Sequence, residues 1–318
     1  MAIAVLQAAR SDAPHRSHGG RIGRRGYFSE NLRVTISADK QAKSVRRTDP
    51  SGALPQGLQR LDLVRVDRDG SRHQIDRVVP DEVPVALVYN GISHAVMMAT
   101  PLDLEDFALG FSLSEGIIGD AAELLDIESG PAGEGMEVRL DITGRAFTAL
   151  KERRRNLTGR TGCGICGVDS IDQAVRDLPR LANDRHFSAA AIFRALDQLP
   201  ALQVLNRESR TLHAAGFCDA EGNVQIVRED VGRHNALDKL IGALRRQKID
   251  VATGFGVITS RCSSEMVQKA VAIGLPMLVA VSAPTGLAQE LADRYGLTLI
   301  ALARSDSLII VSEGWRLS

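Results

Sequence analysis

The stretch that decides the fold runs from Phe255 to Leu302 and reads FGVITSRCSSEMVQKAVAIGLPMLVAVSAPTGLAQELADRYGLTLIAL. Its short apolar runs have the length expected of buried strands: 255–259, 277–281 and 297–302. The segments between them carry helix caps and helical spacing: 263–273 and 285–295. Strands that alternate with helices predict a sheet covered on both faces, so we predict a three-layer α/β/α domain over residues 186–318.

The other elements of this C-terminal domain follow from caps and alternation. A helix is predicted from Ser188 to Leu199, and another from about Asn235. Between them, Thr211–Cys218 and Asn223–Arg228 flank a polar turn and predict a hairpin. Leu308–Val311 predicts a final edge strand. The domain therefore begins with a helix and a hairpin before strands and helices alternate.

The N-terminal half predicts a smaller α+β domain over residues 51–150. Leu61–Val66 and Val83–Tyr89 alternate as strands do, and Asn90-Gly91 is a hairpin turn signal before a returning strand, Ser93–Ala99. These segments predict the first strands of the domain.

A helix follows this hairpin in the prediction. Thr100 has the character of an N-cap before a proline at the first helical position, and Gly116 ends the segment. Asp126–Ile142 then predicts a pair of strands, and a further helix is expected from Ser170 to about Leu178.

Composition limits the class of protein. Residues 1–50 are rich in Arg, Ser, Gly and His, which predicts a disordered tail. The 39 basic and 39 acidic side chains balance, so no overall field favours a nucleic acid or a membrane as partner. No apolar run is long enough to span a bilayer, and no basic residue precedes the opening apolar stretch. We therefore expect a cytoplasmic protein.

Cys163 and Cys166 lie in a glycine-rich run within 151–185, which we predict to be a mobile reactive loop followed by a helix. Basic residues upstream and a helix start downstream favour the thiolate, the nucleophilic form of cysteine. The spacing fits a redox-active dithiol, a zinc site, or a nucleophilic loop that carries sulfur. Structural zinc usually needs four ligands, and the chain has no second cysteine pair, so we favour the sulfur carrier.

Polar turns follow several of the predicted strands in the C-terminal domain. Arg233 and His234 lie in one turn, Arg261 in the next, and Ser282–Thr285 forms a third. An arginine can bind phosphate at two points, and a histidine can exchange a proton. Alternatively, Asp230 only caps the next helix and His234 borders its apolar face. Because ligands of open α/β sheets gather at strand ends, we expect these turns to share one cleft.

Motifs that occur in the same order along the chain resemble the FdhD family. They are Asn90-Gly91, Met98–Phe107, Gly110-Phe111, Ser114–Ile117, Gly162–Gly167, Glu229–Lys239, Ser282–Thr285 and Gly296–Leu299. The resemblance covers residues 60–318 and leaves the N-terminal tail unmatched. It implies a sulfurtransferase that is needed for formate dehydrogenase activity.

Members of the family are understood to take sulfur from a cysteine desulfurase onto the Cys-x-x-Cys loop as a persulfide. They then pass this sulfur to the bis-molybdopterin guanine dinucleotide form of the molybdenum cofactor, before the cofactor enters formate dehydrogenase. On this resemblance, Cys163 matches the persulfide carrier and Cys166 its partner. A homodimer is also plausible from the family.

The resemblance further implies that the C-terminal domain is similar to the cytidine-deaminase fold without its zinc ligands. Guanine-dinucleotide binding maps onto one strand-and-turn segment: Leu302, Ala303, Arg304, Ser305, Asp306 and Ser307. Arg233, His234 and Arg261 complete the expected cofactor-binding set. Ala301-Leu302 replaces the Gly-Phe that is more usual in the family. The alternative function is a non-enzymatic chaperone that binds the molybdenum cofactor and holds zinc on its cysteine pair.

Overall fold

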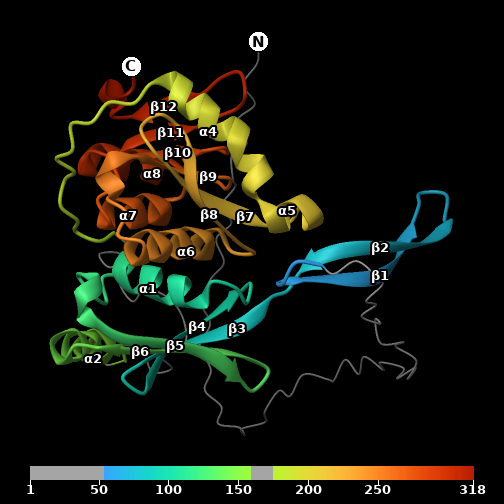
Figure 1. The fold of residues 1–318 in the computed structure, drawn as a ribbon, viewed down its shortest axis with the longest axis horizontal. Helices are drawn as coiled ribbons and strands as arrows, with labels where there is room; N and C mark the ends of the chain where they lie inside the picture. The colour runs from blue at the N-terminus through green and yellow to red at the C-terminus, as the bar shows by residue number, and fades with distance from the viewer. Residues whose placement is uncertain (1–53, 159–174) are drawn as a thin grey trace, which may run out of the picture. The chain divides into compact units, whose positions relative to one another are not determined.

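The structure is a computed structural model that describes residues 54–158 and 175–318, all within one compact unit (Figure 1). The predicted tail at residues 1–50 lies outside the described residues, and so do Cys163 and Cys166. Among the described helices, none is long and apolar enough to cross a membrane.

The larger sheet has six strands in the order β12-β11-β10-β9-β7-β8. Its strands are β7 (His213–Cys218), β8 (Val224–Asp230), β9 (Phe255–Ile258), β10 (Met277–Ala280), β11 (Thr298–Ala301) and β12 (Ile309–Ser312). The strands β9, β10 and β11 are parallel, whereas β7 is antiparallel to both of its neighbours and β12 is antiparallel to β11. The carboxyl ends of β8, β9, β10 and β11 therefore lie at one edge of the sheet.

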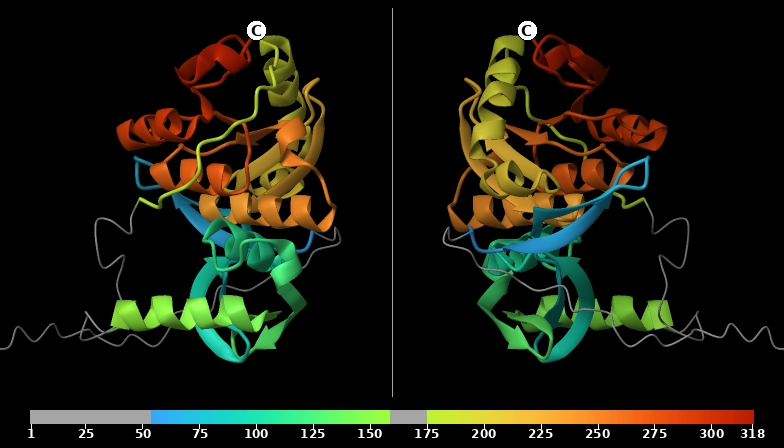
Figure 2. Two further views of the ribbon diagram at one scale, coloured as in Figure 1. Left: turned by 90° about the vertical axis from the view of Figure 1, so that its left-hand side faces the viewer. Right: turned by 90° about the vertical axis from the view of Figure 1, so that its right-hand side faces the viewer.

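Helices cover both faces of this sheet: α4 (Ala189–Leu202), α6 (Arg233–Arg246), α7 (Ser264–Ala272) and α8 (Gly286–Tyr295). Alternate strand residues point to opposite faces. One set shares a core with α4: Val257, Val279 and Ile300. The other set shares a core with α6, α7 and α8: Ile258, Leu278 and Leu299. Figure 2 shows α4 and α8 on opposite sides of the sheet, which confirms the predicted three-layer arrangement.

The smaller sheet has four strands in the order β4-β3-β6-β5. They are β3 (Val83–Tyr89), β4 (Ile92–Ala99), β5 (Leu124–Ala132) and β6 (Gly135–Ile142), and they are accompanied by α1 (Leu104–Ser114) and α2 (Gly144–Thr158). The predicted turn between β3 and β4 is confirmed, because Asn90 and Gly91 have φ of 45° and 79°. Two successive positive φ angles are typical of the type I′ hairpin turn.

A close crossing of α1 and α6 joins the two sheets. A Cβ atom on Gly110 would lie 1.8 Å from the carbonyl oxygen of Asp238, and one on Gly242 would lie 1.9 Å from that of Asp106. Glycine is required at both positions because any side chain would overlap backbone. The buried apolar residues of the smaller sheet and those on the α6, α7 and α8 face of the larger sheet accordingly form one continuous core.

A separate two-stranded sheet consists of β1 (Leu58–Val66) and β2 (Arg72–Pro80), visible as the blue ribbon in Figure 1. Its base packs against the short helix α5 (Val204–Ser209) through Leu58, Leu205 and Leu212. Short 3₁₀ turns complete the described elements: η1 (Ala121–Glu123), η2 (Val251–Thr253) and η3 (Gly314–Arg316).

Some boundaries differ from the predictions. The helix expected to start at Thr100 starts at Leu104, because Thr100 is buried, its N–H donates to Asp230 at the end of β8, and its hydroxyl accepts the N–H of Val231. Within the helix predicted for 170–178, the described residues 175–178 are not helical. Residues 151–158 were assigned to the reactive loop, but they continue α2.

Candidate functional site

The polar turns expected from the sequence lie side by side at the carboxyl edge of the larger sheet. The turn after β9 is bonded to the turn after β10, because Cys262 N–H donates to Ala283 O at 3.1 Å. The turn after β11 is bonded to the turn after β10, because Leu302 N–H donates to Ser282 O at 3.2 Å. These bonds give one continuous layer of loops, flanked by the start of α6 after β8.

Arg233 and His234 occupy the first turn of α6, and both are half-buried. Arg233 Nε is buried and has no hydrogen-bond partner among the described residues. His234 Nε2 lies 2.7 Å from the Glu265 carboxylate, which comes from the first turn of α7. Burial lowers the pKa of His234, and Arg233 and Lys269 lower it further although Glu265 opposes them. This histidine is therefore mainly neutral near neutral pH.

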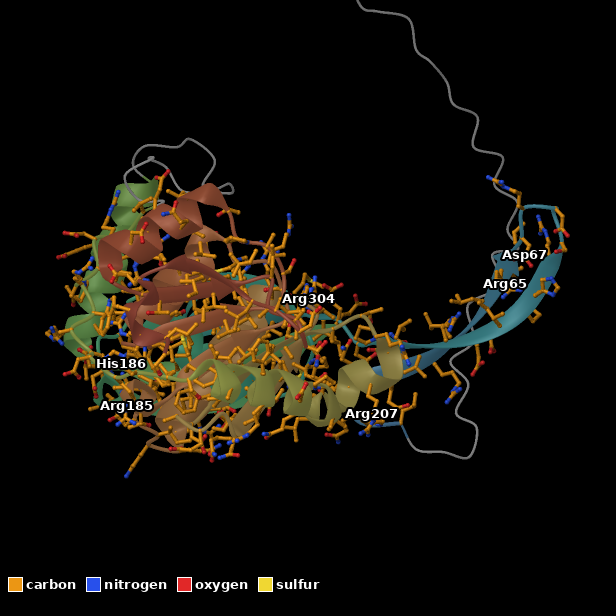
Figure 3. All side chains as sticks on the ribbon, turned by 90° about the horizontal axis from the view of Figure 1, so that it is seen from above. Arg65, Asp67, Arg185, His186, Arg207 and Arg304 are labelled. Atoms are coloured by element: carbon orange, nitrogen blue, oxygen red, sulfur yellow. The ribbon has the colours of Figure 1, made fainter. Side chains whose placement is uncertain are left out.

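The remaining predicted cofactor residues follow β9 and β11. Arg261 is exposed, and so are the turn residues 304–307, whereas Ala303 is buried. Arg304 N–H donates to Ser307 O at 2.7 Å and closes the turn, and its side chain lies at the surface in Figure 3.

Leu302 has a left-handed backbone, with φ of 49°. That conformation is strained for a residue with a branched side chain, and such strain is frequent at ligand sites. The strain coincides with the segment to which guanine binding was mapped.

The structure also separates residues that a metal site would need together. Cys218 pairs with Phe255 at the start of β9, whereas Cys262 follows the end of β9, so these two cysteines lie at opposite edges of the sheet. Both are buried, and burial raises the pKa of each thiol to about 12. A zinc site that uses all four cysteines of the chain is incompatible with this placement.

Most of the polar motif around the start of α6 supports the fold and does not face a ligand. The buried Asp230 carboxylate accepts N–H groups from Thr100, Gly232 and Asn235 at 2.7–3.0 Å and forms a 2.7 Å ion pair with Lys239. The simple alternative, that Asp230 caps α6, is wrong, because Gly232 is the N-cap without a side-chain cap and Asp230 instead binds Gly232 N–H, the Asn235 side chain and Thr100. The sequence feature that could have revealed this network is the placement of Asn235 and Lys239 on the buried side of α6.

A second buried network joins α6, α7 and the end of α1, and sequence reasoning missed it. Lys269 on α7 donates to Asp238 on α6 at 3.0 Å and to Glu115 at 2.7 Å. Ser114 Oγ also donates to Asp238, at 2.6 Å. These residues are far apart in the sequence, so only the fold brings them together.

The family of this chain follows from its similarity to known protein families. Residues 80–318 match the FdhD/NarQ family. The chain belongs to the FdhD/NarQ family. The match includes both larger sheets, the cysteine pair and every candidate residue at the carboxyl edge.

Similar FdhD/NarQ relatives are each named sulfur carrier protein FdhD. The chain is 52% identical over 237 residues to that of Variovorax paradoxus, with 74% of this chain and 85% of the relative covered. It is 51% identical over 251 residues to that of Xanthomonas oryzae pv. oryzae, with 79% of this chain and 89% of the relative covered. It is 48% identical over 270 residues to that of Xanthomonas axonopodis pv. citri, with 85% of this chain and 96% of the relative covered.

A solved structure shares the fold of this FdhD/NarQ member. It is a crystal structure of a protein from Desulfotalea psychrophila assigned as a formate dehydrogenase accessory protein. The TM-score is 0.68 at 24% identity, with 82% of this chain and 100% of the other covered. The likeness supports the mixed α/β fold.

Proposed function

We propose that this FdhD/NarQ protein is a sulfur carrier in the maturation of formate dehydrogenase. In this proposal a cysteine desulfurase supplies the sulfur, Cys163 carries it as a persulfide, and the bis-molybdopterin guanine dinucleotide molybdenum cofactor receives it as substrate. Relatives about half identical to the chain bear the name sulfur carrier protein.

One observation of the structure carries the assignment of the thiol. Cys218 and Cys262 are buried, with the pKa of each thiol raised to about 12, so neither forms a thiolate near neutral pH. Of the four cysteines, Cys163 and Cys166 are left for nucleophilic chemistry.

The two cysteines together account for every bond that forms and breaks in the sulfur transfer. The Cys163 thiolate attacks the outer sulfur of the desulfurase persulfide, the donor S–S bond breaks, and the donor cysteine leaves as thiolate. The Cys166 thiolate then attacks the inner sulfur of the Cys163 persulfide and releases hydrosulfide for the molybdenum. The resulting Cys163–Cys166 disulfide is reopened by an external thiol reductant.

The carboxyl edge of the larger sheet suits an acceptor that carries several phosphates. Arg233, Arg261 and Arg304 bring cationic side chains to this edge, and the N-termini of α6, α7 and α8 lie there too. Helix N-termini and arginine both favour phosphate. We propose that the segment 302–307 receives the guanine dinucleotide part of the cofactor and that the fold is of the cytidine-deaminase type.

Mass spectrometry tests the sulfur step. The full chain is incubated with a cysteine desulfurase and free cysteine, and we expect one added sulfur on the peptide with Cys163, absent in Cys163→Ala. Cys218→Ala serves as control and should still be loaded, because that thiol is buried. An unmodified peptide in the unsubstituted protein, together with stoichiometric zinc, would instead support the cofactor-binding chaperone.

We also propose that the protein acts in the cytoplasm as a homodimer. Light scattering after size-exclusion chromatography measures the oligomeric state, and a monomeric mass would contradict this part of the proposal.

A further inference from the structure

The end of α1 binds the chain on both sides of the segment that carries the cysteine pair. We call residues Ser114–Gly116 the α1 hub. Arg153, near the end of α2, donates from Nη1 to Glu115 O at 2.9 Å. Arg176, just beyond residue 174, donates from Nη1 to Ser114 O. Two arginines that flank the cysteines in sequence therefore bind neighbouring carbonyl groups.

The residues around Arg176 hold both its side chain and its main chain in place. Gly116 has φ of 65°, and a Cβ atom there would lie 2.8 Å from Arg176 Nη2, so the absence of a side chain makes room for the guanidinium. The backbone N–H of Arg176 donates to Gln268 Oε1 at 2.7 Å, and its carbonyl accepts the hydroxyl of Tyr295. Main chain and side chain of this residue are both fixed.

The charge of the hub balances these cations. The Glu115 carboxylate lies 2.7 Å from Lys269 Nζ. Burial alone would raise the pKa of Glu115, but Lys269, Arg176 and Arg153 together hold it below the ordinary value. The carboxylate is therefore charged near neutral pH, and its field favours both arginines.

Two contacts between α6 and α7, an ion pair and a histidine–carboxylate contact, lie between the hub and the carboxyl edge. Asp238 and Lys269 form a 3.0 Å pair between α6 and α7. One helical turn earlier on the same two helices, His234 and Glu265 form a 2.7 Å pair at the helix N-termini. Because Lys269 also binds Glu115, the hub is attached to α7, and through Asp238 to α6, the two helices whose N-termini lie at the carboxyl edge.

We propose that the α1 hub positions the cysteine-bearing segment for delivery of sulfur at the carboxyl edge. Arg153 and Arg176 are positioning residues that attach the two ends of this segment to a frame shared with α6 and α7. The purpose of the positioning rests on the proposed function, whereas the attachment itself does not. The two parts are tested by separate measurements.

Spin labelling tests the attachment. A nitroxide is placed on Cys166 in full-length Cys163→Ala protein, where the buried thiols of Cys218 and Cys262 remain unlabelled. The electron paramagnetic resonance spectrum of this label reports how freely the segment rotates, with or without any sulfur chemistry.

Removal of both guanidinium groups is the decisive change. In Arg153→Met/Arg176→Met we expect the spectrum to shift toward faster motion. Arg180→Met is the matched control, because Arg180 lies in the same stretch of chain but donates to Asp293 O and Arg294 O at the end of α8. An unchanged spectrum in the double variant, or an equal shift in the control, would overturn the attachment.

Delivery of ³⁵S tests the positioning. Protein loaded from [³⁵S]cysteine and a desulfurase is mixed with the molybdenum cofactor and with cofactor-free formate dehydrogenase, and the ³⁵S that reaches the enzyme with its cofactor is counted. In the double variant we expect unchanged loading of Cys163 but delivery slowed by about 10- to 100-fold, since small misplacements of reacting groups have effects of that size. Arg176→Lys in the Arg153→Met background should restore part of the rate, because lysine keeps one donor.

Each result of this second measurement has one meaning. Normal delivery from the double variant would overturn the positioning role, and so would parallel loss of loading and delivery with a lowered melting temperature, which indicates damage to the fold. If the unsubstituted protein takes up no ³⁵S, the proposed function fails, while the spin label still decides whether the arginines attach the segment.

Discussion

Lys239 and Asp230 form a 2.7 Å ion pair in which neither side chain has any exposed surface. The pair lies where the β8 strand turns into α6, and it also binds the carbonyl of Thr100, since Lys239 Nζ donates to that oxygen at 2.9 Å. The start of α6, with Arg233 and His234, is thereby attached to the loop that precedes α1.

Lys239→Met should therefore destabilise the fold strongly. It leaves the Asp230 carboxylate buried beside no cation, a loss of about 3–5 kcal/mol in the free energy of unfolding. Urea denaturation followed by circular dichroism measures it. Arg139→Met is the control, because Arg139 pairs with Glu128 at the surface and its removal should change little. Equal effects of the two changes would contradict the buried network.

Gly110→Ala should also destabilise the protein, by about 3 kcal/mol or more, because overpacking against backbone forces a shift of the helices. The new Cβ would lie 1.8 Å from the carbonyl oxygen of Asp238. Gly144→Ala provides the comparison, since a Cβ there meets nothing within 4 Å. Thermal unfolding of both variants distinguishes a close crossing of α1 and α6 from a general intolerance of alanine.

The stability contributed by Glu115 should depend on pH. Lys269, Arg176 and Arg153 outweigh burial and hold its pKa below the ordinary 4.5. The unfolded state then binds the proton more readily, so the contribution is complete above about pH 4.5 and is lost as the pH falls through the folded-state pKa. Urea denaturation should show Glu115→Gln less stable than the unsubstituted protein at about pH 7, with the difference shrinking toward about pH 3. A difference that grows on acidification would reverse the sign that we infer.

Thiol titration should separate the cysteines into two classes. With Ellman's reagent, Cys163 and Cys166 should react in the native protein after reduction, whereas Cys218 and Cys262 should react only in denaturant, because both are buried. Native labelling of Cys218 or Cys262, located by peptide mass spectrometry, would contradict their assignment as inert core residues.

Arg304→Ala should weaken the binding of GDP, used as a probe of the guanine dinucleotide, by about tenfold. A hydrogen bond to a charged phosphate contributes on the order of 1.5–3 kcal/mol, and 1.4 kcal/mol corresponds to tenfold. Arg294→Ala is the control, because Arg294 is exposed in the last turn of α8, at the end of the helix away from the carboxyl edge. Calorimetric titration that finds the two variants alike would remove the segment 302–307 from the site.

The sequence predicted those strands and turns that depend only on residues near each other in the chain. Val83–Tyr89 was predicted with the bounds that the structure has, because alternation and the Asn90-Gly91 turn are properties of neighbouring residues. The strand Arg72–Pro80 was missed, because it is mostly polar and most of its residues are exposed or half-buried, so it lacks a clear apolar alternation.

Other features depend on distant parts of the chain. Thr100 has the sequence of an N-cap, but Asp230, 130 positions later, binds its N–H and holds it outside the helix. The α1 hub was invisible for the same reason, since Lys269 and Arg176 reach it only in the folded protein. At the carboxyl edge, the alternation of strands and helices was enough to predict that these turns would gather at one edge of the sheet.

The glycine crossing between α1 and α6 has a consequence for how the chain can be divided. At Gly110 and Gly242 the backbones of α1 and α6 are in direct contact. Because no flexible side chains lie between them, one sheet cannot slide or tilt against the other. Either half made alone would expose the buried face of α1 or of α6 to water and leave its buried polar groups without their partners, so we expect it to aggregate and not to behave as an autonomous module.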